Sequence, residues 1–243
     1  MGSWTKQTGY PIIKAEIKNN KLILEQERFF YLKKKDSQIW NIPIELHINN
    51  KKEYYLMTSK KAEIKVNGDV KINKSQIGFF RIRYDNEMLN KVMKSKLDFK
   101  EKLGLLNDIY ALTRGSYIPI DKYLNLVYNY RNEDHYIIWD EISTGLAKID
   151  SLFHEEHKEK LDKFTLKIYS RLYNKLKWDE KKTDTHTDIL LRANILGSLG
   201  LAGHKEIISE AKKRFKEFLK GKGINPNIRS IVYGLVVFAD DKE

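Results

Sequence analysis

The spacing of apolar residues changes once along the chain, near Asp85. Before Asp85, apolar and polar positions alternate, and short clusters of Asn, Gly and Lys interrupt the alternation. A period of two residues is typical of a strand with one buried face. The clearest run is Trp40, Ile42, Ile44, Leu46 and Ile48. The first third of the chain is therefore predicted to be β-structure.

Turn signals divide these strands. Asn19-Asn20 separates Ile17 from Leu22, and Asn67-Gly68 separates Val66 from Val70. Asn-Gly between alternating segments predicts a hairpin, because both central residues of a type I′ turn need positive φ. We expect seven or eight short antiparallel strands, which form a small β-sandwich domain over residues 1–85.

After Asp85, apolar residues recur every three or four positions, which is the period of an amphipathic helix. Asp98 is the expected cap of one helix, and Pro119 lies near the start of the next. The last three helices are expected at about 188–201, 205–219 and 227–239, with Thr187 or Asp188 capping the first of them. Successive helices with tight turns predict an α-solenoid-like array of paired, HEAT/ARM-like helices over residues 86–243. The predicted fold class is multi-domain, β then α.

Composition restricts the class of protein. The chain has 243 residues, 41% of them hydrophobic, and 28 of them aromatic, which is too apolar for a disordered coil. It has no Cys, so disulfides and thiolate metal sites are excluded. No apolar run approaches the roughly 20 residues of a membrane span, and Met1 to Trp4 do not start a signal peptide. We expect a soluble, cytoplasmic protein that binds no membrane.

The net charge of +12 raises the question of nucleic-acid binding. The excess is mostly Lys scattered among Glu, Asn and Ile, whereas nucleic-acid surfaces cluster Arg and Lys with stacking aromatics. The one dense cluster, Lys33-Lys34-Lys35, is followed at once by Asp36 and is interpreted as a solvated loop. No nucleic-acid partner is predicted.

Candidate chemistry is sparse. Zincin sites need two His four residues apart, whereas His154 and His157 are three apart in a run of charges, which favours a solvated helix start. His186 is interpreted as part of a polar linker. Gly197 and Gly200 lie in a helical pattern with no phosphate-loop Lys, so close helix packing explains them best. No catalytic, cofactor-binding or metal residue is assigned.

Several motifs, in order, resemble one family. Trp4-Thr5-Lys6-Gln7-Thr8-Gly9-Tyr10-Pro11 resembles the W-x-x-Q-x-G-[YF]-P segment of the zinc aminopeptidases that include aminopeptidase N, puromycin-sensitive aminopeptidase and the tricorn-interacting factors. Residues 78–85 resemble the closing strand of that family's β-sandwich, and Leu105-Leu106-Asn107-Asp108 resembles a helix that follows it. Later matches are Tyr123-Leu124, Glu133, Tyr136-x-x-Trp139, Leu191-Arg192, Ala211 and Phe215.

The chain lacks the motifs that carry the catalytic chemistry of this family. The zinc ligands of H-E-x-x-H and the amine-binding G-x-M-E-N segment are both missing. We interpret Met1-Gly2-Ser3 as a cloning remnant and the chain as an excised piece, a sandwich plus the first half of a helical domain truncated at its C-terminus. The resemblance implies a parent enzyme whose missing catalytic domain holds zinc.

Two function classes stay open at this point. In the first, the chain is the non-catalytic C-terminal region of an aminopeptidase that removes N-terminal residues from peptides, and its helical domain helps to wall the peptide cavity. In the second, it is a self-standing protein-interaction module. The chain alone is expected to be inactive, with peptides and the catalytic domain as partners. The apolar last helix predicts self-association through residues 227–239.

Overall fold

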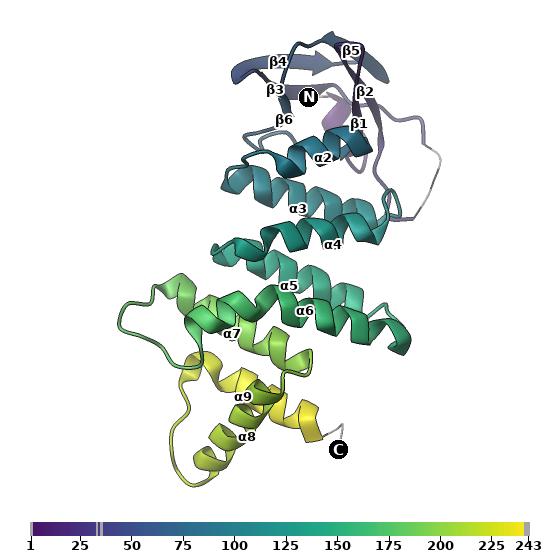
Figure 1. Ribbon diagram of the computed structural model, residues 1–243. Coiled ribbons are helices and arrows are strands. Elements are labelled where there is room, and N and C mark those ends of the chain that lie inside the picture. The colour runs from purple at the N-terminus through teal and green to yellow at the C-terminus, as the bar shows by residue number, and fades with distance from the viewer. Residues whose placement is uncertain (1, 33, 35, 241–243) are drawn as a thin grey trace. The chain divides into compact units, whose positions relative to one another are not determined.

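The computed structural model describes residues 2–32, 34 and 36–240: after one short N-terminal helix come the strands and then the longer helices (Figure 1). This order confirms the predicted β-then-α fold class. The chain forms two compact units, residues 1–126 and 127–243. The last strand ends at Tyr84, whereas the first unit also contains two whole helices after it. The domain boundary expected at residue 85 stays a prediction.

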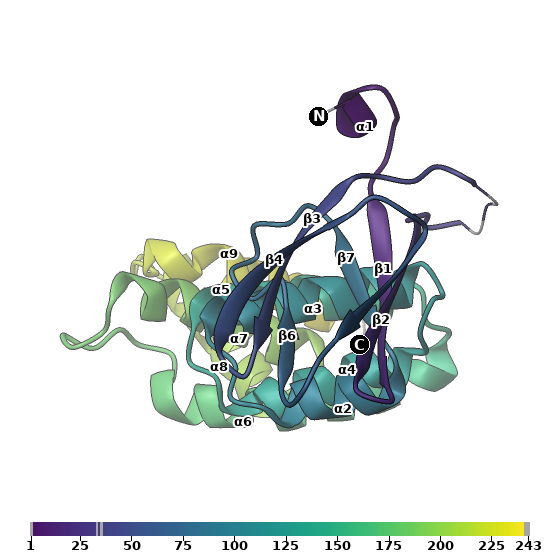
Figure 2. The same cartoon turned by 90° about the horizontal axis from the view of Figure 1, so that it is seen from above.

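Unit 1 contains a short helix, α1 (Gly2–Thr5), and two facing β-sheets. Figure 2 shows the strands of both sheets. One sheet has the order β5-β2-β1-β7, and the other has the order β4-β3-β6. The strands are β1 (Pro11–Lys18), β2 (Lys21–Arg28), β3 (Ile42–Ile48), β4 (Lys51–Met57), β5 (Lys61–Lys65), β6 (Val70–Ile72) and β7 (Arg81–Tyr84).

Two Asn-Asn turns behave as their sequence indicates. Asn19 and Asn20 have φ of 50° and 56° and join β1 to β2, and Asn49 and Asn50, at 49° and 66°, join β3 to β4. Asn tolerates positive φ better than most residues, and two such residues in succession suit a tight hairpin turn.

Two predicted features of the sandwich are wrong. Asn67-Gly68 does not form a hairpin, because β5 pairs with β2 and β6 pairs with β3 in the other sheet. Only Gly68 has positive φ there, so the segment crosses between sheets instead of reversing within one. The strands are also not all antiparallel, since β7 pairs with β1 in parallel. The long path from β1 to β7 allows the chain to re-enter the sheet in the same direction.

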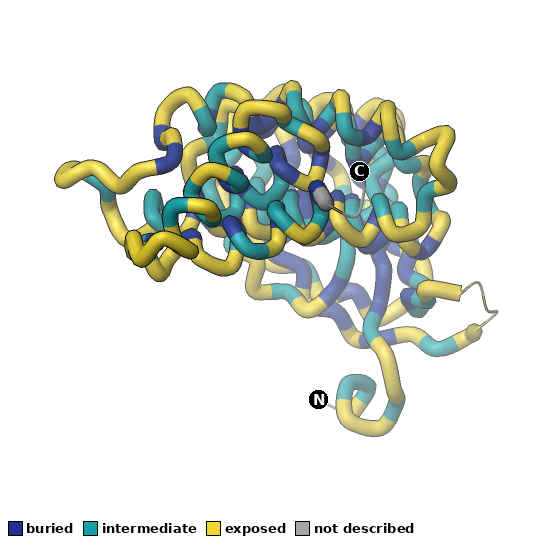
Figure 3. Tube along the Cα trace, turned by 90° about the horizontal axis from the view of Figure 1, so that it is seen from below, coloured by how far each residue is buried: buried dark blue, intermediate teal, exposed yellow. Residues whose placement is uncertain are grey.

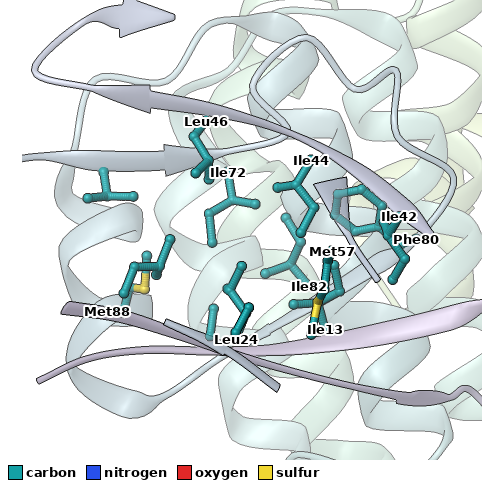
Figure 4. Close-up of a cluster of buried hydrophobic side chains, with 14 of the residues drawn as sticks. Ile13, Leu24, Ile42, Ile44, Leu46, Met57, Ile72, Phe80, Ile82 and Met88 are labelled. Atoms are coloured by element: carbon teal, nitrogen blue, oxygen red, sulfur yellow. The ribbon is translucent and has the colours of Figure 1, made fainter. Parts of the chain in front are cut away.

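The core of unit 1 lies between the two sheets. Alternate residues of β3, Ile42, Ile44 and Leu46, are at most 1% exposed, as the alternation predicts. Figure 4 shows that side chains from both sheets, together with Met88, point into the shared interior. Gln26 is buried too, and its amide bonds the backbone of Trp40 in both directions, at 2.7 and 2.9 Å.

Helices follow the strands of unit 1. α2 (Asn86–Lys94) is capped by Asp85, whose side chain accepts from Met88 N. α3 (Phe99–Arg114) starts with a capping box of Asp98 and Glu101, which confirms Asp98 as a cap. α4 (Ile120–Asn129) begins directly after Pro119.

Unit 2 is helical throughout its described part. It contains η1 (Tyr130–Asn132), α5 (Tyr136–Asp150), α6 (Glu155–Leu176), α7 (His186–Leu201), α8 (Lys205–Leu219) and α9 (Pro226–Asp240). Buried and exposed positions interchange along these helices (Figure 3). α7 packs against α5, α6, α8 and α9, which makes it the central helix of the unit.

The start and the packing of α7 refine the sequence prediction. The N-cap is Thr185, not Thr187 or Asp188, and His186 is the first helical residue instead of part of a linker. Thr185 and Asp188 form a reciprocal capping box, which fixes this earlier start. Gly197 and Gly200 face α9, and a Cβ on Gly200 would lie 2.3 Å from Leu235 Cδ2. Close helix packing is thus confirmed as the role of Gly200.

The last helix buries one face and exposes the other. Ile228, Val232 and Leu235 are at most 2% exposed, whereas Val237 is 61% exposed. In the part of the chain that the structure describes, no helix is both long enough and apolar enough to cross a membrane. The loop predicted at Lys33-Lys34-Lys35 includes Lys33 and Lys35, which lie outside the described residues.

Candidate interaction surfaces

The first motif anchors the N-terminal segment to the sandwich. Trp4 Nε1 donates to the carbonyl of Asn41 at 2.8 Å, and Gln7 Nε2 donates to the carbonyl of Ile39 at 2.9 Å. Gly9 has φ +86°, and a Cβ there would lie 2.6 Å from Arg28 Nε. Trp4 and Gln7 therefore hold the segment before β1 against residues 39–41, and Gly9 allows its close approach to Arg28.

Three separate motifs meet in one half-buried network. Arg81, from β7, donates to Tyr10 OH at 3.2 Å and to Asp108 Oδ1 at 3.2 Å. Asp108, from α3, also accepts from Ile82 N at 3.0 Å. Tyr10 stacks on Phe29 with ring centroids 5.3 Å apart, and the Arg81 guanidinium lies 5.6 Å from each ring centroid.

This network ties the N-terminal segment, β7 and α3 together. Burial raises the pKa of the Asp108 carboxyl, and the Ile82 amide and Arg81 oppose that rise. An isolated buried charge is costly, so each partner is needed to satisfy the others. The contacts of Tyr10, Arg81 and Asp108 thus give these motif residues a structural role in the fold.

Motif residues of unit 2 are structural in the same way. Trp139 is fully buried, donates to the carbonyl of Glu133 at 2.8 Å and packs on Tyr169 with centroids 4.8 Å apart. Arg192 is 1% exposed and pairs with Asp184 in the loop before α7. Burial raises the pKa of Tyr169 to about 12, so its hydroxyl stays a neutral hydrogen-bonding group.

His154 and His157 lie at the start of α6 and form no metal site with the described residues. His154 is the exposed N-cap of α6 and makes no side-chain capping bond, and His157, one turn later, pairs with Glu156 at 3.1 Å. Among the described residues, no three His, Asp or Glu side chains are grouped so that they could hold a metal ion. Catalytic zinc usually has three protein ligands, so the residues present do not fit a catalytic zinc.

An aromatic patch, defined as Trp4, Tyr10 and Phe79, marks one surface of unit 1. Phe79 is 69% exposed, and its ring centroid lies 6.2 Å from that of Trp4 and 5.5 Å from that of Tyr10. The loop that presents Phe79 is held by buried Asn73, which bonds Gly78 N at 2.8 Å and Gly78 O at 3.2 Å. The sequence contained a signal for this exposure. Phe80 and Ile82 alternate as buried strand positions do, so Phe79, one position out of phase with them, is expected to face away from the core.

A lysine groove, formed by α8 and the end of α9, marks unit 2. It is an open cavity of about 820 Å³. Among the described residues, its charged lining consists of Lys205, Lys212, Lys213, Lys216, Lys220 and one carboxylate, Glu217. Ile208, Phe238 and Ala239 add apolar surface to the same groove. The four-residue spacing of Lys212, Lys216 and Lys220 could have been noticed in the sequence, but the contribution of α9 could not.

Comparison with known proteins is consistent with these features. The profile of the ERAP1-like C-terminal domain family matches residues 70–243. Aminopeptidase M1 of Arabidopsis thaliana is 31% identical, over 98% of this chain and 30% of its own length. Puromycin-sensitive aminopeptidase of Caenorhabditis elegans and alanine/arginine aminopeptidase of Saccharomyces cerevisiae are each 27% identical, over 100% and 97% of this chain. They are covered over 28% and 29% of their own lengths, so the chain spans less than a third of each relative.

The matched region includes the closing strand of the sandwich and every helix of unit 2. The resemblance inferred from the motifs is therefore confirmed: the chain belongs to the ERAP1-like C-terminal domain family and corresponds to the C-terminal part of an M1 aminopeptidase.

Proposed function

We propose that this chain is the non-catalytic C-terminal region of a zinc aminopeptidase that removes N-terminal residues from peptides. The observation that carries the proposal is the match of nearly the whole chain to less than a third of several aminopeptidases. In this proposal the helical unit helps to wall the space that peptides enter. A cytoplasmic location is part of the proposal, supported by a chain without cysteine.

The zinc belongs, in this proposal, to a catalytic part outside the chain. When bound there, it would activate water for attack on the peptide bond. The residues of this chain contribute positioning only: the Tyr10–Arg81–Asp108 network fixes the N-terminal segment against the sandwich, and that segment joins the catalytic part in a longer protein.

The aromatic patch is the proposed contact for the catalytic part. Trp4 belongs to the patch, so any residues that precede it in a longer protein would start beside Phe79. A large aromatic side chain that is mostly exposed on a braced loop is typical of an interface anchor. The Phe79 ring would become buried when the catalytic part docks.

The first test is the reading frame upstream of the Trp4 codon in the source genome. We expect H-E-x-x-H within a few hundred codons. Its absence would favour the alternative function, a self-standing interaction module.

The second test is assembly from two polypeptides. The upstream catalytic part and this chain are expressed together, and the cleavage of peptides is measured. We expect Phe79→Asp to abolish co-purification and to lower peptide cleavage. Leu152→Asp is the matched control, because Leu152 is 76% exposed but lies in unit 2. Equal assembly of both variants would refute the role of the patch.

A further inference from the structure

The lysine groove has a regular geometry along α8. Lys205, Ser209, Lys212, Lys216 and Lys220 recur every three or four residues, so they lie along one stripe of the helix. At 1.5 Å per residue, the stripe is about 22 Å long. Ala239 and Phe238 of α9 border the same groove, and α8 and α9 pack directly against each other. The site is therefore an open, elongated groove with one basic wall.

Lys212 and Lys213 of this wall have interaction partners, whereas its other three lysines have no ion pair among the described residues. Lys213 lies 3.4 Å from Glu210, and the one carboxylate of the lining, Glu217, is engaged by Lys222 at 2.7 Å. Within the described part of the chain, no carboxylate lies within ion-pair distance of Lys205, Lys216 or Lys220. Like charges one helical turn apart repel each other, and an anion placed between them relieves the repulsion.

The apolar residues of the lysine groove favour a ligand that has apolar groups as well as negative charge. Ile208, Phe238 and Ala239 lie in the groove beside the lysines. An inorganic anion or a sugar-phosphate backbone would leave this apolar surface unused. A peptide that carries both carboxylates and apolar side chains would satisfy both parts, as amphipathic segments do in other helical grooves. A groove of about 22 Å accommodates roughly 15 helical residues.

We propose that the lysine groove binds an acidic peptide segment through its side-chain carboxylates, with apolar side chains of the peptide packed against Phe238 and Ile208. The inference deepens the proposed function, on which it rests for the supply of peptides to the helical unit. It assigns that unit a preference for acidic peptides at a surface made wholly of α8, α9 and the turn before α8.

The test uses the full chain and a fluorescent peptide of about 15 residues built from Glu and Leu at helical spacing. Its C-terminus is amidated, so that only side chains carry negative charge. Binding is followed by fluorescence anisotropy. We expect Lys216→Glu with Lys220→Glu to weaken binding at least about tenfold, and higher salt to weaken wild-type binding several-fold.

The matched control is Lys160→Glu with Lys182→Glu. Both lysines are exposed in unit 2 and lie outside the groove, so the change in net charge is identical. We expect the control to bind within about twofold of wild type. A peptide with Ser in place of Leu should bind more weakly than the original peptide.

Three results would overturn the inference. The first is no binding of the Glu/Leu peptide by the wild-type chain, and the second is equal weakening of that binding in the control variant. The third is that the wild-type chain binds the Ser peptide and single-stranded RNA as tightly as it binds the Glu/Leu peptide. The last result would identify a general polyanion surface. Because the assay uses this chain alone, failure here leaves two-polypeptide assembly unaffected. Failure of that assembly, in turn, does not alter the anisotropy result.

Discussion

Replacing Gly200 with alanine perturbs the contact between α7 and α9 at its closest point. An ideal Cβ at this position would lie 2.3 and 2.5 Å from the two methyl carbons of Leu235 and 3.0 Å from its Cγ. Leu235 is 2% exposed, so its side chain cannot turn out into solvent. The added methyl must either move Leu235 off its rotamer or push the two helices apart.

Two opposing effects set the magnitude. Overpacking a well-filled core by one methyl group costs about 2 kcal/mol. Alanine is better than glycine within a helix by about 1 kcal/mol, and this gain applies to any Gly→Ala change in α7. We therefore expect Gly200→Ala to lower the free energy of unfolding of unit 2 by about 1 kcal/mol.

Gly197 provides a matched control on the same helix. A Cβ there would lie 3.4 Å from Ile231 Cδ1, an ordinary van der Waals contact. Gly197→Ala should therefore keep the propensity gain and raise the free energy of unfolding by about 1 kcal/mol. The two variants should differ by about 2 kcal/mol, or roughly 8 °C in Tm for a unit of this size.

Urea and thermal unfolding followed by far-UV circular dichroism measure both variants, because most helical residues belong to unit 2. Adding Leu235→Val to Gly200→Ala removes one methylene beside the new methyl and should recover part of the loss. If Gly200→Ala proves as stable as Gly197→Ala, the packing argument for Gly200 is refuted.

Three other expectations concern pH, catalysis and association. Burial by itself raises the pKa of Glu45, but hydrogen bonds from Lys52, Ser75 and His47 outweigh burial and lower it to about 2. This folded-state pKa lies below the unfolded value, so Glu45 contributes stability above pH 4.5 that is lost as pH falls toward 2, on the order of 3 kcal/mol. Glu45→Gln should flatten the acid side of a stability-versus-pH curve, and an unchanged slope would contradict this. The chain alone should not hydrolyse aminoacyl fluorogenic substrates, with or without added zinc; stoichiometric zinc with activity lost in His154→Ala would show the opposite. Self-association through residues 227–239 should appear in sedimentation and weaken in Val237→Glu, because Val237 is 61% exposed, whereas a strict monomer at high concentration would exclude it.

Local rules were sufficient for many elements of this fold. The alternation of Ile42, Ile44 and Leu46 predicted a strand with one buried face, and Asp98 predicted a helix start. Each of these depends on residues within a few positions of one another, since side-chain period and capping are set by the local backbone. The ordered motifs also identified the family, and three of their residues, Tyr10, Arg81 and Asp108, satisfy one another in a half-buried network.

Some features of this protein depend on contacts between residues far apart in the chain, and only the tertiary structure reveals them. Asn67-Gly68 has a hairpin sequence, but β5 pairs with β2 and β6 pairs with β3, so the two strands that flank it belong to different sheets. An isolated hairpin of two short strands is only marginally stable, so pairing with the larger sheets prevails. The parallel pairing of β1 with β7 joins residues about 70 positions apart, and no local signal encodes it. The lysine groove exists because α9 returns to α8 and places Phe238 beside lysines up to 33 positions earlier. The sequence determined the charges and the helical period, whereas long-range packing determined that they form one groove, because α9 buries Val232 and Leu235 as it packs against α7 and α8.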